Sequence, residues 1–194
     1  MRKILLIIAG LFGLALLTNL ISPNMIVNGD FETGDFSSWT LIGNPQNNGV
    51  DTGFPHSGLY NAVFGEKDAL GSLSQTIHTQ VGAAYVLSFW FAPDSPNPEV
   101  NMPHRFSVSI DNHVLLDLTN PQGGDYHHYS YRFTAASKTT KLTFQFRDKT
   151  FFMKLDDVSV IPAATVIQLH SLYYVGTWLL DLIFNTSEIK ENNR

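Results

Sequence analysis

Cysteine is absent from this chain of 194 residues. Its absence excludes disulfide scaffolds, thiol nucleophiles, thiolate zinc sites and iron–sulfur clusters. Charged residues are few, at 15%, against 44% hydrophobic residues, which is enough apolar material for a packed core and too little charge for a disordered chain. The net charge of −5 is also the wrong sign for a protein that binds phosphate backbones, so nucleic acid is not an expected partner.

Motifs of common enzymes are absent as well. The chain has no Gly-x-Ser-x-Gly nucleophile elbow, no phosphate loop and no dinucleotide-binding fingerprint. A glycosidase needs two carboxylates across a cleft, and no motif places such a pair, because most of the acids fall in predicted turns or in a predicted metal site. We therefore expect a binding protein and not an enzyme.

Residues 1–22 have the layout of a secretory signal. Arg2 and Lys3 form a positive start, Ile4 to Leu17 are apolar, and a short, more polar end follows. We therefore predict a signal peptide at 1–22 and an exported protein, either secreted or at the cell surface. No clean Ala-x-Ala cleavage motif is present, so a retained anchor and a buried N-terminal helix are the alternatives.

Residues 163–194 form a second unusual segment. Its apolar part, Thr165 to Phe184, is interrupted by several polar residues, which makes a membrane-spanning helix marginal. One helical face collects its larger apolar side chains, namely Trp178, Leu179, Leu182 and Ile183. We expect an amphipathic tail that packs on the domain or on a partner protein, and a membrane anchor is the alternative.

Between these ends, residues 24–162 consist of short runs with alternating apolar and polar side chains, separated by turn residues. Tyr85 to Ala92 is an example, with one apolar face and one polar face. The predicted strands are Met25–Glu32, Tyr60–Phe64, Leu73–His78, Tyr85–Ala92, Arg105–Asp111, His113–Leu118, His128–Thr134, Lys141–Arg147 and Met153–Ile161. Strands of this number and length predict an all-β fold, a two-sheet antiparallel β-sandwich of the jelly-roll kind.

Four sequence blocks occur in an order that resembles the carbohydrate-binding modules of the CBM4/9 type. They are NMIVNGDFETGDFSSWT from Asn24, PHSGLYNA from Pro55, YVLSFW from Tyr85 and LDDVSV from Leu155. The resemblance covers about residues 24–162 and implies a jelly roll of the galactose-binding-like superfamily. It also implies that the partner is a polysaccharide or an oligosaccharide, although one scaffold of this kind serves many roles.

Among the outward residues of the predicted strands, which also include Ser88 and Ser107, five suit a ligand. They are Trp90, Arg105, Arg132, Gln145 and Arg147. An indole packs against the C–H face of a sugar ring, while amides and guanidinium groups bond its hydroxyls. We predict that these residues bind the ligand, and three arginines also suit an acidic sugar. Alternation does not say which strands share a sheet, so the set stays open to division between two faces.

A calcium site is the one cofactor prediction. Asp156 has the same parity as Val158 and Val160, so its carboxylate needs a partner if these residues face the core. The resemblance implies that Glu32 and Asp156 help to hold a structural calcium ion, with a backbone carbonyl near Ser57 as a further ligand; calcium takes six to eight oxygen ligands. The alternative is that Asp156 only accepts hydrogen bonds from backbone amides.

Together these observations predict non-catalytic carbohydrate binding by an exported β-sandwich module. The alternative is a structural or adhesion protein of the cell surface. In that case the sandwich is a scaffold, and the tail at 163–194 serves for anchoring or assembly.

Overall fold

A computed structural model describes residues 24–67, 69–93, 104–148 and 152–163. Within these residues, Asn24–Ile161 forms one compact unit. The predicted signal peptide lies outside the described residues, as does the predicted tail apart from Ala163. No helix among the described residues is long and apolar enough to cross a membrane.

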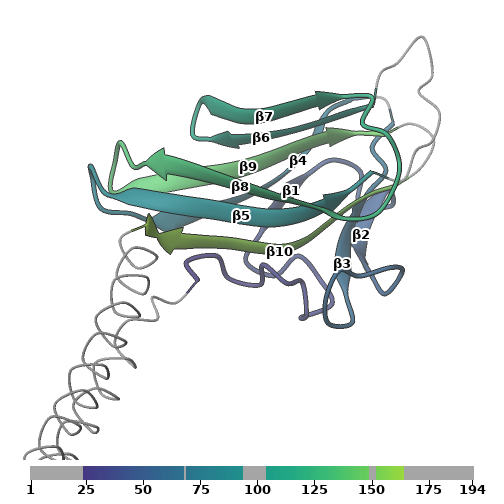
Figure 1. The fold of residues 1–194 in the computed structure, drawn as a ribbon. Coiled ribbons are helices and arrows are strands. Elements are labelled where there is room, and N and C mark those ends of the chain that lie inside the picture. Colours follow the sequence, from purple (N-terminus) through teal and green to yellow (C-terminus); the bar gives the residue numbers. More distant parts are fainter. Residues whose placement is uncertain (1–23, 68, 94–103, 149–151, 164–194) are drawn as a thin grey trace, which may run out of the picture. The chain divides into compact units, whose positions relative to one another are not determined.

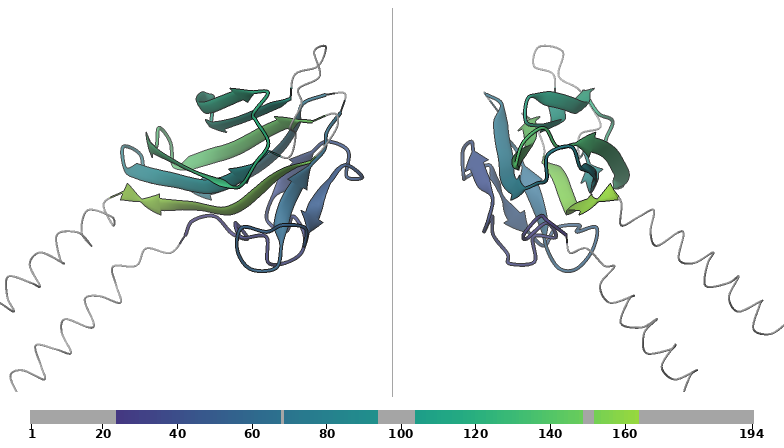
Figure 2. Two further views of the ribbon diagram at one scale, coloured as in Figure 1. Left: turned by 45° about the vertical axis from the view of Figure 1, so that its right-hand side comes forward. Right: turned by 90° about the vertical axis from the view of Figure 1, so that its left-hand side faces the viewer.

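Ten strands form two five-stranded sheets, which lie as two layers (Figures 1 and 2). The first sheet has the order β1 (Thr40–Ile42), β4 (Gly71–His78), β9 (Thr139–Arg147), β6 (Arg105–Ile110) and β7 (His113–Thr119). The second has the order β2 (Asn48–Asp51), β3 (Asn61–Phe64), β10 (Met153–Pro162), β5 (Ala84–Ala92) and β8 (His127–Thr134). Strand pairs in both sheets are antiparallel, which confirms the predicted sandwich.

Phenylalanine side chains from both sheets fill the space between the layers. Phe91 of β5 stacks on Phe106 of β6 with ring centroids 3.7 Å apart, and Phe64 of β3 stacks on Phe146 of β9 at 4.0 Å. All four rings are fully buried. Burying a ring of this size stabilises the fold by roughly 1.5–3 kcal/mol, so the inward side chains fix both the faces and the spacing of the sheets.

The predicted strand Met25–Glu32 is wrong. Asn28 and Phe31 have φ angles of 53° and 56°, a left-handed conformation that interrupts an extended chain. The chain therefore bends at Asn28 and at Phe31. Gly29 instead packs against β10, where a Cβ atom would lie 2.0 Å from the carbonyl oxygen of Val158.

Two short strands, β1 and β2, lie outside the predicted strands. β1 has three residues and β2 has the sequence Asn-Gly-Val-Asp, so neither shows the alternation that identifies a strand. Phe31 is fully buried and Trp39 is 8% exposed. Their rings stack at 5.8 Å, and the Trp39 indole N–H donates a hydrogen bond to the carbonyl oxygen of Asn28.

Candidate functional site

The five residues predicted to bind the ligand lie on the outer faces of both sheets. Trp90 on β5 and Arg132 on β8 belong to the second sheet. Arg105 on β6, together with Gln145 and Arg147 on β9, belongs to the first sheet. The structure therefore brings together a group of two and a group of three, and it does not form one surface from all five.

The outer face of the first sheet is polar. Arg105 lies opposite Arg147 and Ser107 lies opposite Gln145 in the pairing of β6 with β9. The Arg105 guanidinium contacts both carboxylate oxygens of Asp117, at 3.0 and 2.7 Å, and these hydrogen bonds lower the pKa of Asp117. Among the described strands of this sheet, Phe, Tyr and Trp side chains occur only at inward positions. This face can donate hydrogen bonds, but its described strands offer no aromatic surface for a sugar ring.

The outer face of the second sheet carries an aromatic cluster, defined here as Phe54, His56, Trp90, Tyr126 and His128. Loops supply the first two residues and Tyr126, while β5 and β8 supply the others. Phe54 stacks on Tyr126 at 5.9 Å, Tyr126 meets His56 edge-on at 5.4 Å, and His56 stacks on Trp90 at 3.8 Å. His128 lies opposite Trp90 in the pairing of β5 with β8, and the centroids of their rings are 4.9 Å apart. The cluster is thus a continuous row of rings.

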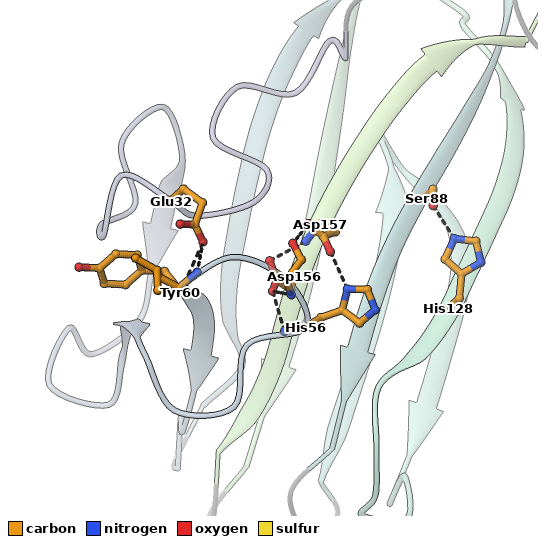
Figure 3. A network of polar contacts seen from close by, with 9 residues as sticks. Glu32, His56, Tyr60, Ser88, His128, Asp156 and Asp157 are labelled. Atoms are coloured by element: carbon orange, nitrogen blue, oxygen red, sulfur yellow. Dashed lines mark hydrogen bonds and ion pairs between the residues drawn. The ribbon is translucent and has the colours of Figure 1, made fainter.

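Trp90 differs from the free platform that the sequence suggests, because the imidazole of His56 covers one face of its indole at an interplanar angle of 18°. The His56 Nδ1 atom lies 2.6 Å from a carboxylate oxygen of Asp157, which fixes the imidazole in this position (Figure 3). On β5 and β8, the Ser88 hydroxyl and the His128 Nε2 atom also lie 2.6 Å apart.

Phe54 is an open ring of the cluster, because 56% of the residue is accessible to solvent. Its backbone is left-handed, with a φ angle of 65°, and the Lys154 amino group lies 5.5 Å from its ring centroid. Behind it, the Tyr126 hydroxyl is buried without a hydrogen-bond partner among the described residues. Burial raises the pKa of Tyr126, and the charge of Asp156 adds to the effect, so the phenol stays neutral and gives Phe54 a fixed backing.

Sequence reasoning missed four members of this cluster as binding residues. Phe54, His56 and Tyr126 lie in loops, outside any alternating pattern, and His128 lies on a strand whose pairing with Trp90 the sequence does not show. The available signal was the sequence Gly-Phe-Pro at 53–55, since a large aromatic side chain between two turn residues has no strand to bury it.

Asp156 lies under the loop that carries His56 and Ser57. Its carboxylate accepts hydrogen bonds from the backbone N–H groups of His56 and Ser57, at 2.9 and 3.2 Å, and from that of Asp157 at 2.8 Å (Figure 3). Burial raises the pKa of Asp156 to about 6, although these amide hydrogen bonds act in the opposite direction. The amide-accepting role that the sequence left open for Asp156 is therefore present.

The parity argument for Asp156 needs a correction. Met153, Leu155, Val158 and Val160 are all buried in the core, so the alternation of β10 shifts by one residue between Leu155 and Val158. Asp157, with a φ angle of 49°, lies at this shift. Asp156 consequently points away from the core that Val158 and Val160 enter, and it is fully buried because the loop covers it.

Glu32 approaches the same loop from another side. Its Oε1 atom accepts hydrogen bonds from the backbone N–H groups of Leu59 and Tyr60, at 2.8 and 2.9 Å (Figure 3). Gly58 has a φ angle of 62°, and a Cβ atom there would lie 2.2 Å from the Glu32 carboxylate. Among the described residues, no group of three His, Asp or Glu side chains could hold a metal ion. A calcium ion at Glu32 and Asp156 would therefore need backbone carbonyl oxygens as its other ligands.

Comparison with known proteins identifies the family. The model of a carbohydrate binding domain of the CBM4/9 family matches residues 23–150. The chain therefore belongs to this family of carbohydrate-binding modules. No curated protein matches the chain by sequence.

Solved structures share the fold at low identity. A CBM61 module in complex with β-1,4-galactotriose is 18% identical, with a TM-score of 0.60, over 73% of this chain and 99% of the module. The K3 cleaved adhesin domain of Lys-gingipain from Porphyromonas gingivalis W83 is also 18% identical, with a TM-score of 0.53, over 70% of this chain and 96% of that domain. The carbohydrate-binding module 2 of family 16 is 15% identical, with a TM-score of 0.52, over 71% of this chain and 99% of the module. Likeness at this level establishes the jelly-roll fold and leaves the ligand open.

Proposed function

We propose that this domain binds carbohydrate without cleaving it and that the aromatic cluster on the second sheet is the contact surface. The observation that carries the proposal is the exposure of Phe54, more than half of whose surface is accessible while Tyr126 supports it from behind. A sugar ring places its C–H face on such a ring and directs its hydroxyls outward. Lys154 and His128 are polar groups of the same face that can bond those hydroxyls.

The carboxylates beside the cluster support binding over hydrolysis. Asp156 is engaged by backbone amides, and both Asp157 oxygens are engaged by the side chains of His56 and Ser57. A glycosidase needs one carboxyl group that donates a proton and a second that acts as a base or nucleophile. Here the two adjacent acids of β10 hold the loop that carries Phe54 and His56 instead.

The first test is affinity electrophoresis of the full-length protein in gels that contain single polysaccharides. β-1,4-linked galactan is the first to include, because the CBM61 module has been solved with β-1,4-galactotriose. We expect retardation in at least one gel, with modest affinity because the surface is shallow. Equal mobility in gels with and without every polysaccharide would contradict the proposal, as would release of reducing sugar during incubation.

We also propose that Glu32 and Asp156 take part in binding a structural calcium ion. Glu32 and Asp156 hold opposite sides of the 56–60 loop (Figure 3), and a backbone carbonyl near Ser57 would complete the oxygen ligands that calcium requires. A calcium ion at this site would neutralise the carboxylates of Glu32 and Asp156, which both contact the backbone of the 56–60 loop. We include structural calcium in the proposal on this basis.

Export is also part of the proposal, and it depends on the sequence of residues 1–22 alone. Mass spectrometry of the protein recovered outside the cytoplasm should find a mature N-terminus near Pro23. An intact Met1 in that fraction would favour a retained anchor.

A further inference from the structure

The open side of the sandwich contains a groove that the aromatic cluster does not include. β7 is the last strand of the first sheet and β8 the last strand of the second. The hairpin between β6 and β7, at residues 110–115, forms one wall of the groove, and residues 132–136 of β8 and the following turn form the other. Its volume of about 750 Å³ lies in the range of small-molecule sites.

Arg132 is the cation of this groove. Its side chain is exposed, and within the described part of the chain it has neither an ion pair nor a side-chain hydrogen bond. Arg105 provides the contrast, because both oxygens of Asp117 already occupy its guanidinium. A guanidinium group presents paired N–H donors that match the two oxygens of a carboxylate. Arg132 is thus free to bind an acidic group of a ligand.

The other walls suit a sugar ring. Leu115 contributes apolar surface, and Asn112 and His113 lie on the hairpin side. Phe133 borders the groove, but its ring is 8% exposed and stacks on Tyr85 in the core. The one acidic residue of the groove, Asp111, accepts the backbone N–H of Lys141 at 2.8 Å with one oxygen. One carboxylate oxygen of Asp111 therefore stabilises the turn, and the other can accept a hydrogen bond from a hydroxyl group of a ligand.

We propose that this groove binds the hexuronic acid unit of an acidic saccharide, with Arg132 contacting the uronate carboxylate. The proposal rests on the proposed function in one respect, namely that the ligand is a sugar. It concerns a different part of the second sheet: Arg132 shares the outer face with Trp90, but it lies on the last strand, β8, at the edge groove. Arg132 lies opposite Val86 in the pairing of β5 with β8, and Trp90 lies four residues further along β5, which is about 13 Å at the rise of a β-strand.

The test compares two methyl glycosides that differ only at C6, methyl β-glucuronide and methyl β-glucoside, together with the corresponding galactose pair. Saturation-transfer NMR titrations with the full-length protein give the dissociation constants of weak ligands. We expect one uronide to bind on the order of tenfold more tightly than its neutral partner, the gain of a charge-assisted bidentate contact. Salt at 1 M should reduce this preference.

Arg132→Gln should abolish the preference for the uronide, and Arg132→Lys should retain only part of it, because an ammonium group lacks the paired donors. The control is Lys138→Gln, which removes the same charge from an exposed turn position outside the groove walls. Circular dichroism checks that each variant is folded.

Equal binding of both members in each pair would overturn the inference, and so would a uronide preference that survives Arg132→Gln. These failures are distinct from failure of the proposed function. If a neutral polysaccharide binds through Phe54 without any uronide preference, only the groove proposal is wrong. If the uronide depends on Arg132 while no neutral polysaccharide binds, the aromatic cluster is not a sugar surface.

Discussion

Gly29 is a residue whose role depends on the absence of a side chain. A Cβ atom at this position would lie 2.0 Å from the carbonyl oxygen of Val158 and 3.0 Å from the Ile26 side chain. The backbone carbonyl of Gly29 also accepts the N–H of Val158 at 2.8 Å, so a shift of either segment breaks a hydrogen bond. The first segment of the domain is therefore attached to β10 through a contact that only glycine permits.

We predict that Gly29→Ala lowers the free energy of unfolding by about 1–3 kcal/mol, the usual cost of overpacking. Gly49→Ala is the matched control, because a Cβ atom there meets nothing within 4 Å. Urea denaturation followed by circular dichroism measures both variants. Equal midpoints for the two variants would contradict the close approach at Gly29.

Single residues also show how far the sequence predicts the site. The apolar face predicted for Tyr85 to Ala92 is confirmed, because Leu87 and Phe89 are fully buried in the core. Phe54 and His56 were missed because the cluster joins residues far apart in the chain, at 54, 56, 90, 126 and 128. Long-range loop paths bring them together, and no local pattern encodes such a path.

At the scale of the element, alternation was reliable wherever a strand has one face in the core. β5 and β9 follow the expected pattern, with buried Phe89 and Phe144 between exposed or half-buried neighbours. The pattern failed at Met25–Glu32, where two left-handed residues interrupt an apparently regular run. It also failed at Asp156, because a shift inside β10 changes the face of every following residue.

β9 offers a direct comparison of its two faces. Phe144 is fully buried and packs against Phe89, Phe106 and Trp39, whereas the next residue, Gln145, is exposed. We predict that Phe144→Ala costs about 3–5 kcal/mol of unfolding free energy and that Gln145→Ala costs less than about 0.5 kcal/mol. Thermal and urea denaturation measure both changes. Costs of similar size for the two variants would mean that β9 is not placed between core and solvent.

At the scale of the whole molecule, the arrangement of the faces decides the function, and the sequence could not supply it. Alternation assigns Arg105 and Trp90 to outward positions, but it says nothing about which strands are neighbours. The sheet order places Arg105, Gln145 and Arg147 on one outer face and Trp90 with Arg132 on the other. The sandwich therefore presents a polar face, an aromatic face and an edge groove in place of one mixed binding face.

The proposed calcium ion is also a property of the whole domain, because it would link the first segment, the 56–60 loop and β10. A ligand that binds only the folded state at 100 times its dissociation constant stabilises that state by about 2.7 kcal/mol. We therefore predict that a chelator lowers the thermal midpoint by roughly 5 °C or more. Glu32→Gln should remove this difference, while Asp117→Asn, a change on the outer face of the first sheet, should preserve it. An identical midpoint with calcium and with chelator would exclude the ion.

The central claim is that Phe54 and its cluster hold the sugar. It is tested most directly by isothermal titration of the full-length protein with the saccharide that retards it in gels, using Phe54→Ala against Ile42→Ala. Ile42 is 60% exposed on β1 of the first sheet, so its truncation removes a comparable apolar surface from the opposite layer. We expect Phe54→Ala to weaken binding on the order of tenfold and Ile42→Ala to leave the affinity unchanged. Equal affinities for native protein and Phe54→Ala would contradict the claim.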